Sequence, residues 1–134
     1  MNQFYGKARQ RATAAGLQYL TGNIKALLVT AAYTPAIDTD EFVSDIPGGA
    51  ILSRSGNFTS KTNTLGVLDA AAINFALVAA GSVGKYVVVY RDTGVDATSE
   101  LIACDDTGQG LPVTTDGSDI GAQWSSAPNR IGQI

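Results

Sequence analysis

The chain has 134 residues, of which 45% are hydrophobic and 16% are charged, and it contains one cysteine and no histidine. This length fits one domain with a real core, and the missing histidine removes the commonest general base and metal ligand. A single thiol excludes an intrachain disulfide and a cysteine-based metal cluster. No apolar run approaches the ~18 residues of a membrane span or forms a signal peptide. We therefore expect no cofactor and no membrane partner.

The charges are few and unevenly spread. The net charge is −3, Lys7, Arg9, Arg11 and Lys25 precede every acid, and all acids fall between Asp38 and Asp119. A charged fraction below the usual roughly 25% indicates a surface partly covered by partners. The basic N-terminal segment could reach an acidic neighbour or could form a solvated helix face. An acidic chain overall argues against nucleic acid as the partner.

The first third of the chain predicts a helix, a strand and a long loop. Residues 7–20 are rich in helix formers and end at 21–23, and residues 24–30 form an apolar run typical of a central strand. Residues 31–47 hold Asp38, Asp40, Glu41 and Asp45, with Phe42 and Val43 as anchors to the core. Loops of this length are usually functional or ordered by a partner.

The rest of the chain predicts short strands separated by turns. We expect strands near 50–61 with a bulge at Gly56, at 73–78, 85–91, 101–105, 110–114, 119–125 and 130–134, with a turn at 63–64. Cys104, Tyr86, Tyr90 and Trp124 are interpreted as core or sheet residues. About eight strands without crossover helices predict an all-β antiparallel sandwich, jelly-roll-like or immunoglobulin-like, at 24–134, preceded by a basic arm or helix at 1–23.

The motif that most strongly suggests catalysis is Asp92-Thr93-Gly94, and the same tripeptide recurs at 106–108. Asp-Thr-Gly is the core of aspartic protease sites, in which two carboxylates share a proton. Arg91 before the motif and Val95 after it fit such a site poorly, and the second copy follows too closely. The same tripeptide is an ordinary turn. We therefore predict no enzymatic activity and keep a dimeric Asp-Thr-Gly protease as a remote alternative.

Two groups of acids suggest a second alternative, a calcium-dependent module. One group lies in the 31–47 loop, and the other consists of Asp92, Asp96 and Glu100. Oxygen ligands at such spacing suit a hard cation, but neither group matches an EF-hand. The prediction is therefore that the chain holds no metal.

Three blocks carry a resemblance to small tailed-bacteriophage virion proteins. They are Ile24-Lys-Ala-Leu-Leu-Val-Thr-Ala-Ala-Tyr-Thr-Pro, Asp38-Thr-Asp-Glu-Phe, and Tyr90-Arg-Asp-Thr-Gly-Val-Asp-Ala-Thr-Ser-Glu-Leu-Ile-Ala. The pattern continues to Trp124 and to Asn129-Arg-Ile, so it covers most of the chain from residue 24 onward. Within that family the chain is most similar to capsid cement (decoration) proteins.

The resemblance implies a structural protein that binds the major capsid protein on the outer surface of the virion and is made in the bacterial host cytoplasm. Another virion part, such as a tail, collar or head-fibre subunit, is the alternative. Low surface charge further suggests self-association, as a dimer at a two-fold position. The predicted docking residues lie in the basic arm and the acidic loop: Lys7, Arg9, Arg11, Asp38, Asp40, Glu41 and Phe42.

Overall fold

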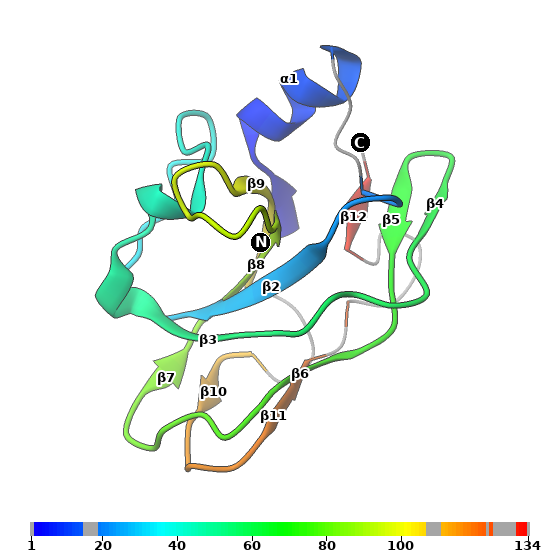
Figure 1. Cartoon of the computed structure of the whole chain (residues 1–134). Helices are drawn as coiled ribbons and strands as arrows, with labels where there is room; N and C mark the ends of the chain where they lie inside the picture. Colours follow the sequence, from blue (N-terminus) through cyan, green and yellow to red (C-terminus); the bar gives the residue numbers. More distant parts are fainter. Residues whose placement is uncertain (1, 15–18, 107–110, 123, 125–130, 134) are drawn as a thin grey trace.

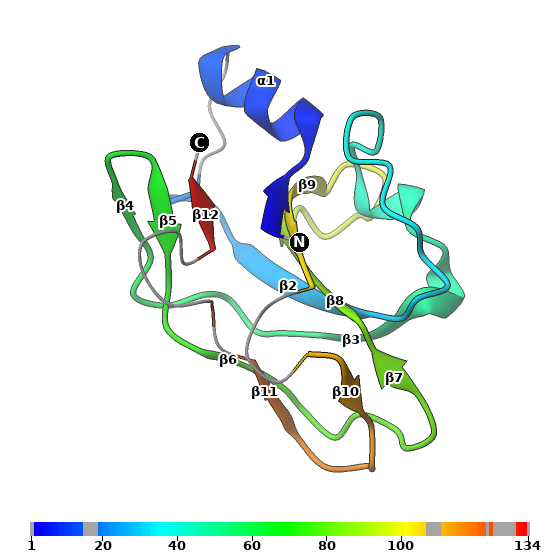
Figure 2. The ribbon, with the colours of Figure 1, turned by 180° about the vertical axis from the view of Figure 1, so that it is seen from behind.

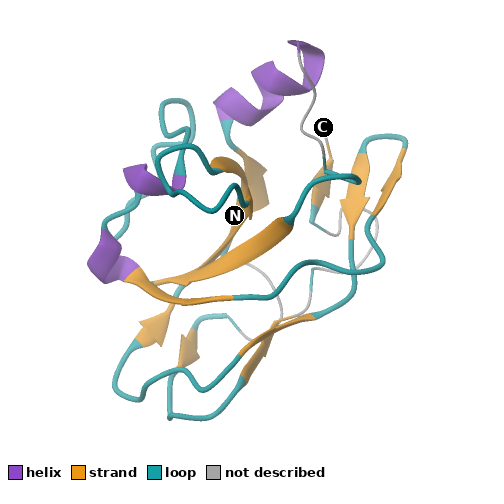
Figure 3. Cartoon of the chain, viewed as in Figure 1, coloured by secondary structure: helices purple, strands orange, loops and turns teal. Residues whose placement is uncertain are grey.

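A computed structural model of the chain describes residues 2–14, 19–106, 111–122, 124 and 131–133. The described part consists mainly of antiparallel strands and loops, with one short α-helix (Figures 1 and 3). The all-β prediction is thereby confirmed, whereas the jelly-roll arrangement of two stacked sheets stays a prediction. None of the described helices is long and apolar enough to span a membrane.

The largest sheet has five strands in the order β1-β9-β8-β2-β3, and all neighbours are antiparallel. Consecutive residues are buried along its three inner strands, so both faces of the sheet are covered. Aliphatic and β-branched side chains favour such strands because they fill a pleated, enclosed surface. The strands are β1 (Asn2–Phe4), β2 (Ile24–Val29), β3 (Ile51–Arg54), β8 (Tyr86–Arg91) and β9 (Glu100–Asp105).

Four short strands form two further antiparallel pairs that lie together in Figures 1 and 2. β6 (Ile73–Phe75) pairs with β11 (Ile120–Ala122), and β7 (Val83–Gly84) pairs with β10 (Val113–Thr114). A Cβ atom on Gly84 would lie 2.6 Å from a Leu28 methyl carbon. Glycine at this position therefore allows β7 to pack closely against the main sheet.

A third small sheet has the order β12-β5-β4. It comprises β4 (Thr62–Thr64), β5 (Val67–Asp69) and β12 (Gly132–Gln133). The Tyr19 hydroxyl donates to the Asp69 carbonyl oxygen at 2.8 Å, and Lys61 Nζ donates to the Gly22 carbonyl oxygen at 2.7 Å. These bonds attach the sheet to the segment that enters β2.

The helical elements are α1 (Gly6–Ala14) and two 3-10 turns, η1 (Val43–Asp45) and η2 (Gly48–Ala50). Tyr5 and Ala8 are fully buried, so the N-terminal segment, including β1, contributes to the common core. Trp124 is also buried, its ring centroid lies 5.2 Å from that of Phe58, and its Nε1 donates to the Ala71 carbonyl oxygen. The interpretation of Trp124 and the buried Cys104 as core residues is confirmed.

Several predicted boundaries were wrong. The strand expected over 50–61 is only β3, and its register on β2 shifts so that Leu52, not Gly56, has no partner residue. Residues 63 and 64 belong to β4, and the turn lies at Leu65-Gly66. The described helix ends at residue 14, residues 19–20 form a turn, and residues 15–18 lie outside the described residues.

Candidate functional site

The predicted docking elements, α1 and the acidic loop, lie against each other (Figures 1 and 2). Arg11 Nη2 lies 2.9 Å from Glu41 Oε1, and Arg11 Nε lies 3.3 Å from Glu100 Oε1. Arg9 Nη2 lies 3.6 Å from Asp38 Oδ1. The sequence predicted two separate elements, whereas the structure joins them into one surface.

The remaining loop acids help to fold the loop itself. Asp40 Oδ2 accepts the Tyr33 hydroxyl at 2.7 Å and the Ala36 N–H at 3.0 Å. Asp45 Oδ2 accepts the N–H groups of Glu41 and Phe42 at 2.8 and 2.9 Å. Carboxylates that accept local N–H groups are typical of well-formed turns. The loop is therefore held in shape before any partner arrives.

A chain of hydroxyl groups connects this loop to the core. The Tyr33 hydroxyl lies 2.8 Å from the hydroxyl of Tyr5, which is fully buried. Burial raises the pKa of both phenols far above the ordinary value, so both stay neutral. The hydrogen bond between the two neutral phenols thus attaches the acidic loop to the interior, in addition to the Arg11–Glu41 ion pair that attaches it to α1.

The seven predicted docking residues differ in how accessible they are. The side chains of Arg9 and Asp38 are 54% and 86% exposed, whereas that of Arg11 is only 14% exposed. Lys7 is half-buried and, with Gln10, Arg11 and Glu41, lines a shallow cleft of about 250 Å³. Phe42 is half-buried and forms a β-bridge with Glu100. Arg9 and Asp38 are therefore the predicted residues most open to a partner.

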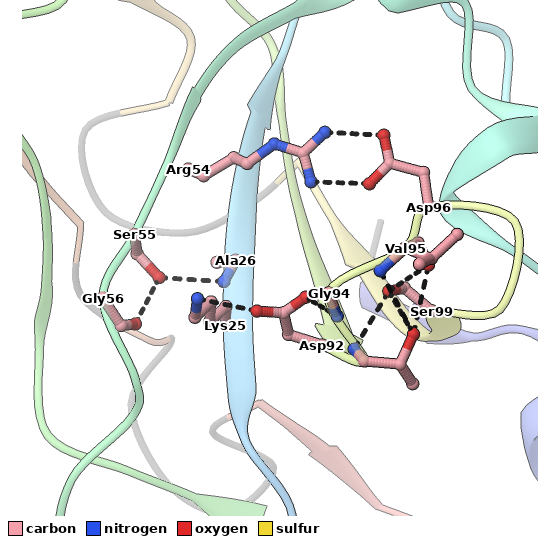
Figure 4. Close-up of polar contacts among 11 residues, drawn as sticks. Lys25, Ala26, Arg54, Ser55, Gly56, Asp92, Gly94, Val95, Asp96 and Ser99 are labelled. Atoms are coloured by element: carbon pink, nitrogen blue, oxygen red, sulfur yellow. Dashed lines mark hydrogen bonds and ion pairs between the residues drawn. The ribbon is translucent and has the colours of Figure 1, made fainter.

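Ion pairs also hold the loop that follows β8 (Figure 4). Lys25 Nζ lies 2.7 Å from Asp92 Oδ2, and Arg54 binds both carboxylate oxygens of Asp96 at 3.0 and 2.9 Å. Asp92 Oδ1 accepts the N–H of Gly94, whose φ is +87°. The interpretation of the first Asp-Thr-Gly as a turn is confirmed; Thr107 and Gly108 of the second copy lie outside the described residues.

Electrostatics keep Asp92 ionised. The hydrogen bond from Lys25, followed by that from the Gly94 N–H, lowers the pKa of Asp92 below its ordinary value. A protease dyad needs a second carboxylate that shares a proton, whereas the group facing Asp92 here is an ammonium. This geometry suits a structural ion pair.

A polar cleft of about 540 Å³ lies beside this turn. Its lining comes from the segment before β2 and from the end of β8: Thr21, Gly22, Asn23, Arg91, Asp92, Thr93 and Gly94. Both charged groups already have partners, because Asp92 binds Lys25 and Arg91 Nη2 lies 3.1 Å from Glu100 Oε2. The cleft therefore offers a ligand mainly hydroxyl and backbone groups.

The acid groups considered for calcium face cations and backbone N–H groups in the structure. Among the described residues, no group of three or more Asp, Glu, Cys or His side chains could hold a metal ion. The arrangement therefore gives the calcium alternative no support within that part of the chain.

The most exposed leucines were missed by the sequence analysis. Leu65 is 92% exposed, and Leu77, which was expected in a half-buried strand, is 75% exposed. Both have positive φ angles, 54° and 47°. Left-handed backbone costs a leucine about 1–2 kcal/mol, and a two-residue hairpin turn such as Leu65-Gly66 prefers asparagine at its first position.

Neither leucine gains much packing in exchange for this conformation. A strained residue with an exposed apolar side chain is a better candidate for a binding site than an exposed apolar residue alone. Leu77 could not be recognised from the sequence, because residues 73–78 alternate like an ordinary strand. Leu65 was missed because the turn was expected at 63–64 and neither β4 nor β5 was predicted as a strand.

No protein-family model matches the chain, and no curated protein matches it in sequence. The fold is all-β, and its most distinctive surface groups are exposed leucines on left-handed backbone.

Proposed function

We propose that the chain is a structural virion protein, a capsid cement protein that binds the major capsid protein and stabilises the shell. The observation that carries this proposal is the pair of exposed leucines, Leu65 and Leu77, held on left-handed backbone. The resemblance of residues 24 onward to virion proteins supports the same class.

The two leucines belong to segments at opposite ends of the molecule. The β4–β5 turn and the β6–β7 connection are far apart in both Figures 1 and 2. A folded body with an apolar contact at each end can bridge two neighbouring subunits. In a shell, many copies multiply such a contact, so a modest affinity at each site is sufficient.

Ion pairs that attach a loop to the main sheet suit a protein under mechanical load. The five-stranded sheet is reinforced by Lys25–Asp92 between β2 and the 92–99 loop, and by Arg54–Asp96 between β3 and the same loop. These ion pairs oppose separation of the 92–99 loop from β2 and β3. Arg9 and Asp38, which are exposed on the surface formed by α1 and the acidic loop, are proposed as a further contact on the outer capsid surface.

The direct test uses capsid shells assembled without this chain. Purified wild-type protein should co-sediment with the shells and raise the temperature at which they fall apart. The double variant Leu65→Asn/Leu77→Asn should stay folded and bind at least about tenfold more weakly, because each lost leucine removes apolar area from the contact. Failure of the wild-type protein to bind any shell would overturn the proposal.

A particle reconstruction discriminates between the virion roles. Density for the chain at capsomer junctions supports the cement role, whereas density on the tail, collar or head fibre replaces it with the alternative. The proposal also includes a dimer of this chain. Sedimentation equilibrium tests it, and a monomer at micromolar concentration would remove the dimer while leaving the cement role in place.

A further inference from the structure

Residues 73–84 and 113–122 form one continuous ribbon, here called the β6–β11 ribbon. Between its two strand pairs, Val78 N–H donates to the Ser118 carbonyl oxygen at 3.2 Å, and Gly117 N–H donates to the Val78 carbonyl oxygen at 2.9 Å. Thr115 N–H donates to the Ser82 carbonyl oxygen at 2.9 Å. These bonds make the two segments a single antiparallel unit.

Leu77 is held outward on this ribbon by Asp119. Asp119 Oδ1 accepts the Leu77 N–H at 2.8 Å, and Oδ2 accepts the Asn74 side-chain amide at 3.3 Å. The next residue, Val78, is buried. The left-handed conformation at Leu77 therefore lets Val78 reach the core while the leucine side chain stands in solvent, braced by a carboxylate.

The charges within the ribbon are negative, and one exposed lysine, Lys85, directly follows its first segment. Its two segments contain Asp116 and Asp119 and no lysine or arginine. Asp116 is exposed and accepts the hydroxyl and N–H groups of Ser118, and these bonds lower its pKa, so it stays ionised. Val83, also exposed, adds apolar surface to the same ribbon.

An apolar projection among carboxylates is complementary to an apolar socket with cations around it. Such charge complementarity speeds association with the correct partner and disfavours binding to partners of like charge. A negatively charged ribbon disfavours nucleic acid as the partner.

We infer that the β6–β11 ribbon docks through Leu77 into an apolar socket on the partner protein that is rimmed by lysine or arginine side chains. This inference rests on the proposed function, and it specifies the chemistry of one of the two contacts.

The test compares Leu77→Asn with wild type for binding to shells that lack the chain. Asparagine adopts left-handed backbone readily, so the melting temperature should stay equal or rise. Removing a buried leucine contact should weaken binding about tenfold to a hundredfold. Ser60→Asn is the matched control, because Ser60 is exposed with a φ of 53° and carries no large apolar group. This control should bind like wild type.

A second variant tests the charge of the rim. Asp116→Lys reverses one charge of the ribbon and removes the hydrogen bonds from Ser118, so its melting temperature should fall slightly. The variant should associate more slowly with the shells, and its association rate should be less sensitive to salt. Faster association of this variant with the shells would contradict the proposal that basic side chains surround the socket. Leu77→Gly provides a backup for the leucine test if the asparagine variant is unstable.

The outcomes separate the inference from the function on which it rests. If wild type binds shells and Leu77→Asn binds equally well, the inference fails and the cement role stands. If wild type binds no shell, the proposed function fails and the inference fails with it. If Leu77→Asn disrupts the dimer but leaves shell binding unchanged, Leu77 contacts a second copy of this chain. That result also overturns the inference.

Discussion

At the scale of single residues, Asp92 shows how one charge holds a loop on a sheet. Its carboxylate binds Lys25 of β2 on one oxygen and the Gly94 N–H of its own turn on the other. The hydrogen bond lowers the pKa of Asp92, and the same contact raises the pKa of Lys25. Each group thus stabilises the charged form of the other.

Asp92→Asn should reduce the loss of stability in acid. Because the folded-state pKa of Asp92 lies below its ordinary value, its contribution is present above that ordinary value and disappears as pH falls through the folded-state pKa. The free energy of unfolding, measured by urea titration, should therefore fall less in the variant than in wild type between about pH 5 and pH 2. Lys25→Met should also reduce the change in the free energy of unfolding over this pH range, because Asp92 loses its ammonium partner. An unchanged slope in both variants would show that the ion pair adds nothing.

At the scale of elements, Arg11 was predicted as a docking residue, but in the structure it joins α1 to the acidic loop and to β9. Arg11 bridges Glu41 in the loop and Glu100 at the start of β9. Its Nη1 is buried and has no hydrogen-bond partner among the described residues, so desolvation offsets part of the attraction. The pair of Arg9 with Asp38 is exposed and should contribute little.

Arg11→Met should therefore destabilise the protein by about 1–3 kcal/mol, because it leaves the partly buried carboxylate of Glu100 with fewer partners. Arg9→Met, the matched control on the same helix, should change stability by less than about 0.5 kcal/mol. Urea unfolding at neutral pH measures both. Equal effects of the two substitutions would contradict the bridging role assigned to Arg11.

At the scale of the whole molecule, one core joins the N-terminal segment, the main sheet and the smaller strand pairs. Cys104 lies in this core on β9 and is fully buried. Burial is the main cause that raises the pKa of its thiol to about 12. The thiolate, which is the reactive form, is therefore scarce in the folded state at neutral pH.

Cys104 should accordingly report on global unfolding. In native protein at pH 8, a thiol reagent such as an aromatic disulfide should label it orders of magnitude more slowly than in guanidinium, where one thiol per chain should react at once. The absorbance of the aromatic thiolate that the reagent releases measures the extent of labelling. Rapid labelling of native protein would mean that the sheet around β9 opens locally.

The inner strands were predictable because their pattern does not depend on distant residues. In β2, β8 and β9, nearly every residue is apolar and buried, and such a run has few alternatives to an enclosed strand. The turn at Asp92-Thr93-Gly94 was predictable for a similar reason, since aspartate and glycine suit it locally. All predicted docking residues except Phe42 are charged, and charge does not reveal which ion pairs form within the chain.

The amino-acid sequence alone was enough to predict an all-β chain with strands at 24–30, 85–91 and 101–105 and a turn at Asp92-Thr93-Gly94, and the structure places these strands at 24–29, 86–91 and 100–105. Hydrophobic runs and turn chemistry are local, so they can be read without the fold. The fold was needed to show that Arg11 pairs with Glu41, 30 positions away. It also showed that Asp119 accepts the N–H of Leu77, 42 positions away, and that the leucine side chain is exposed. Those outcomes depend on which distant groups meet, and neither periodicity nor composition contains that information.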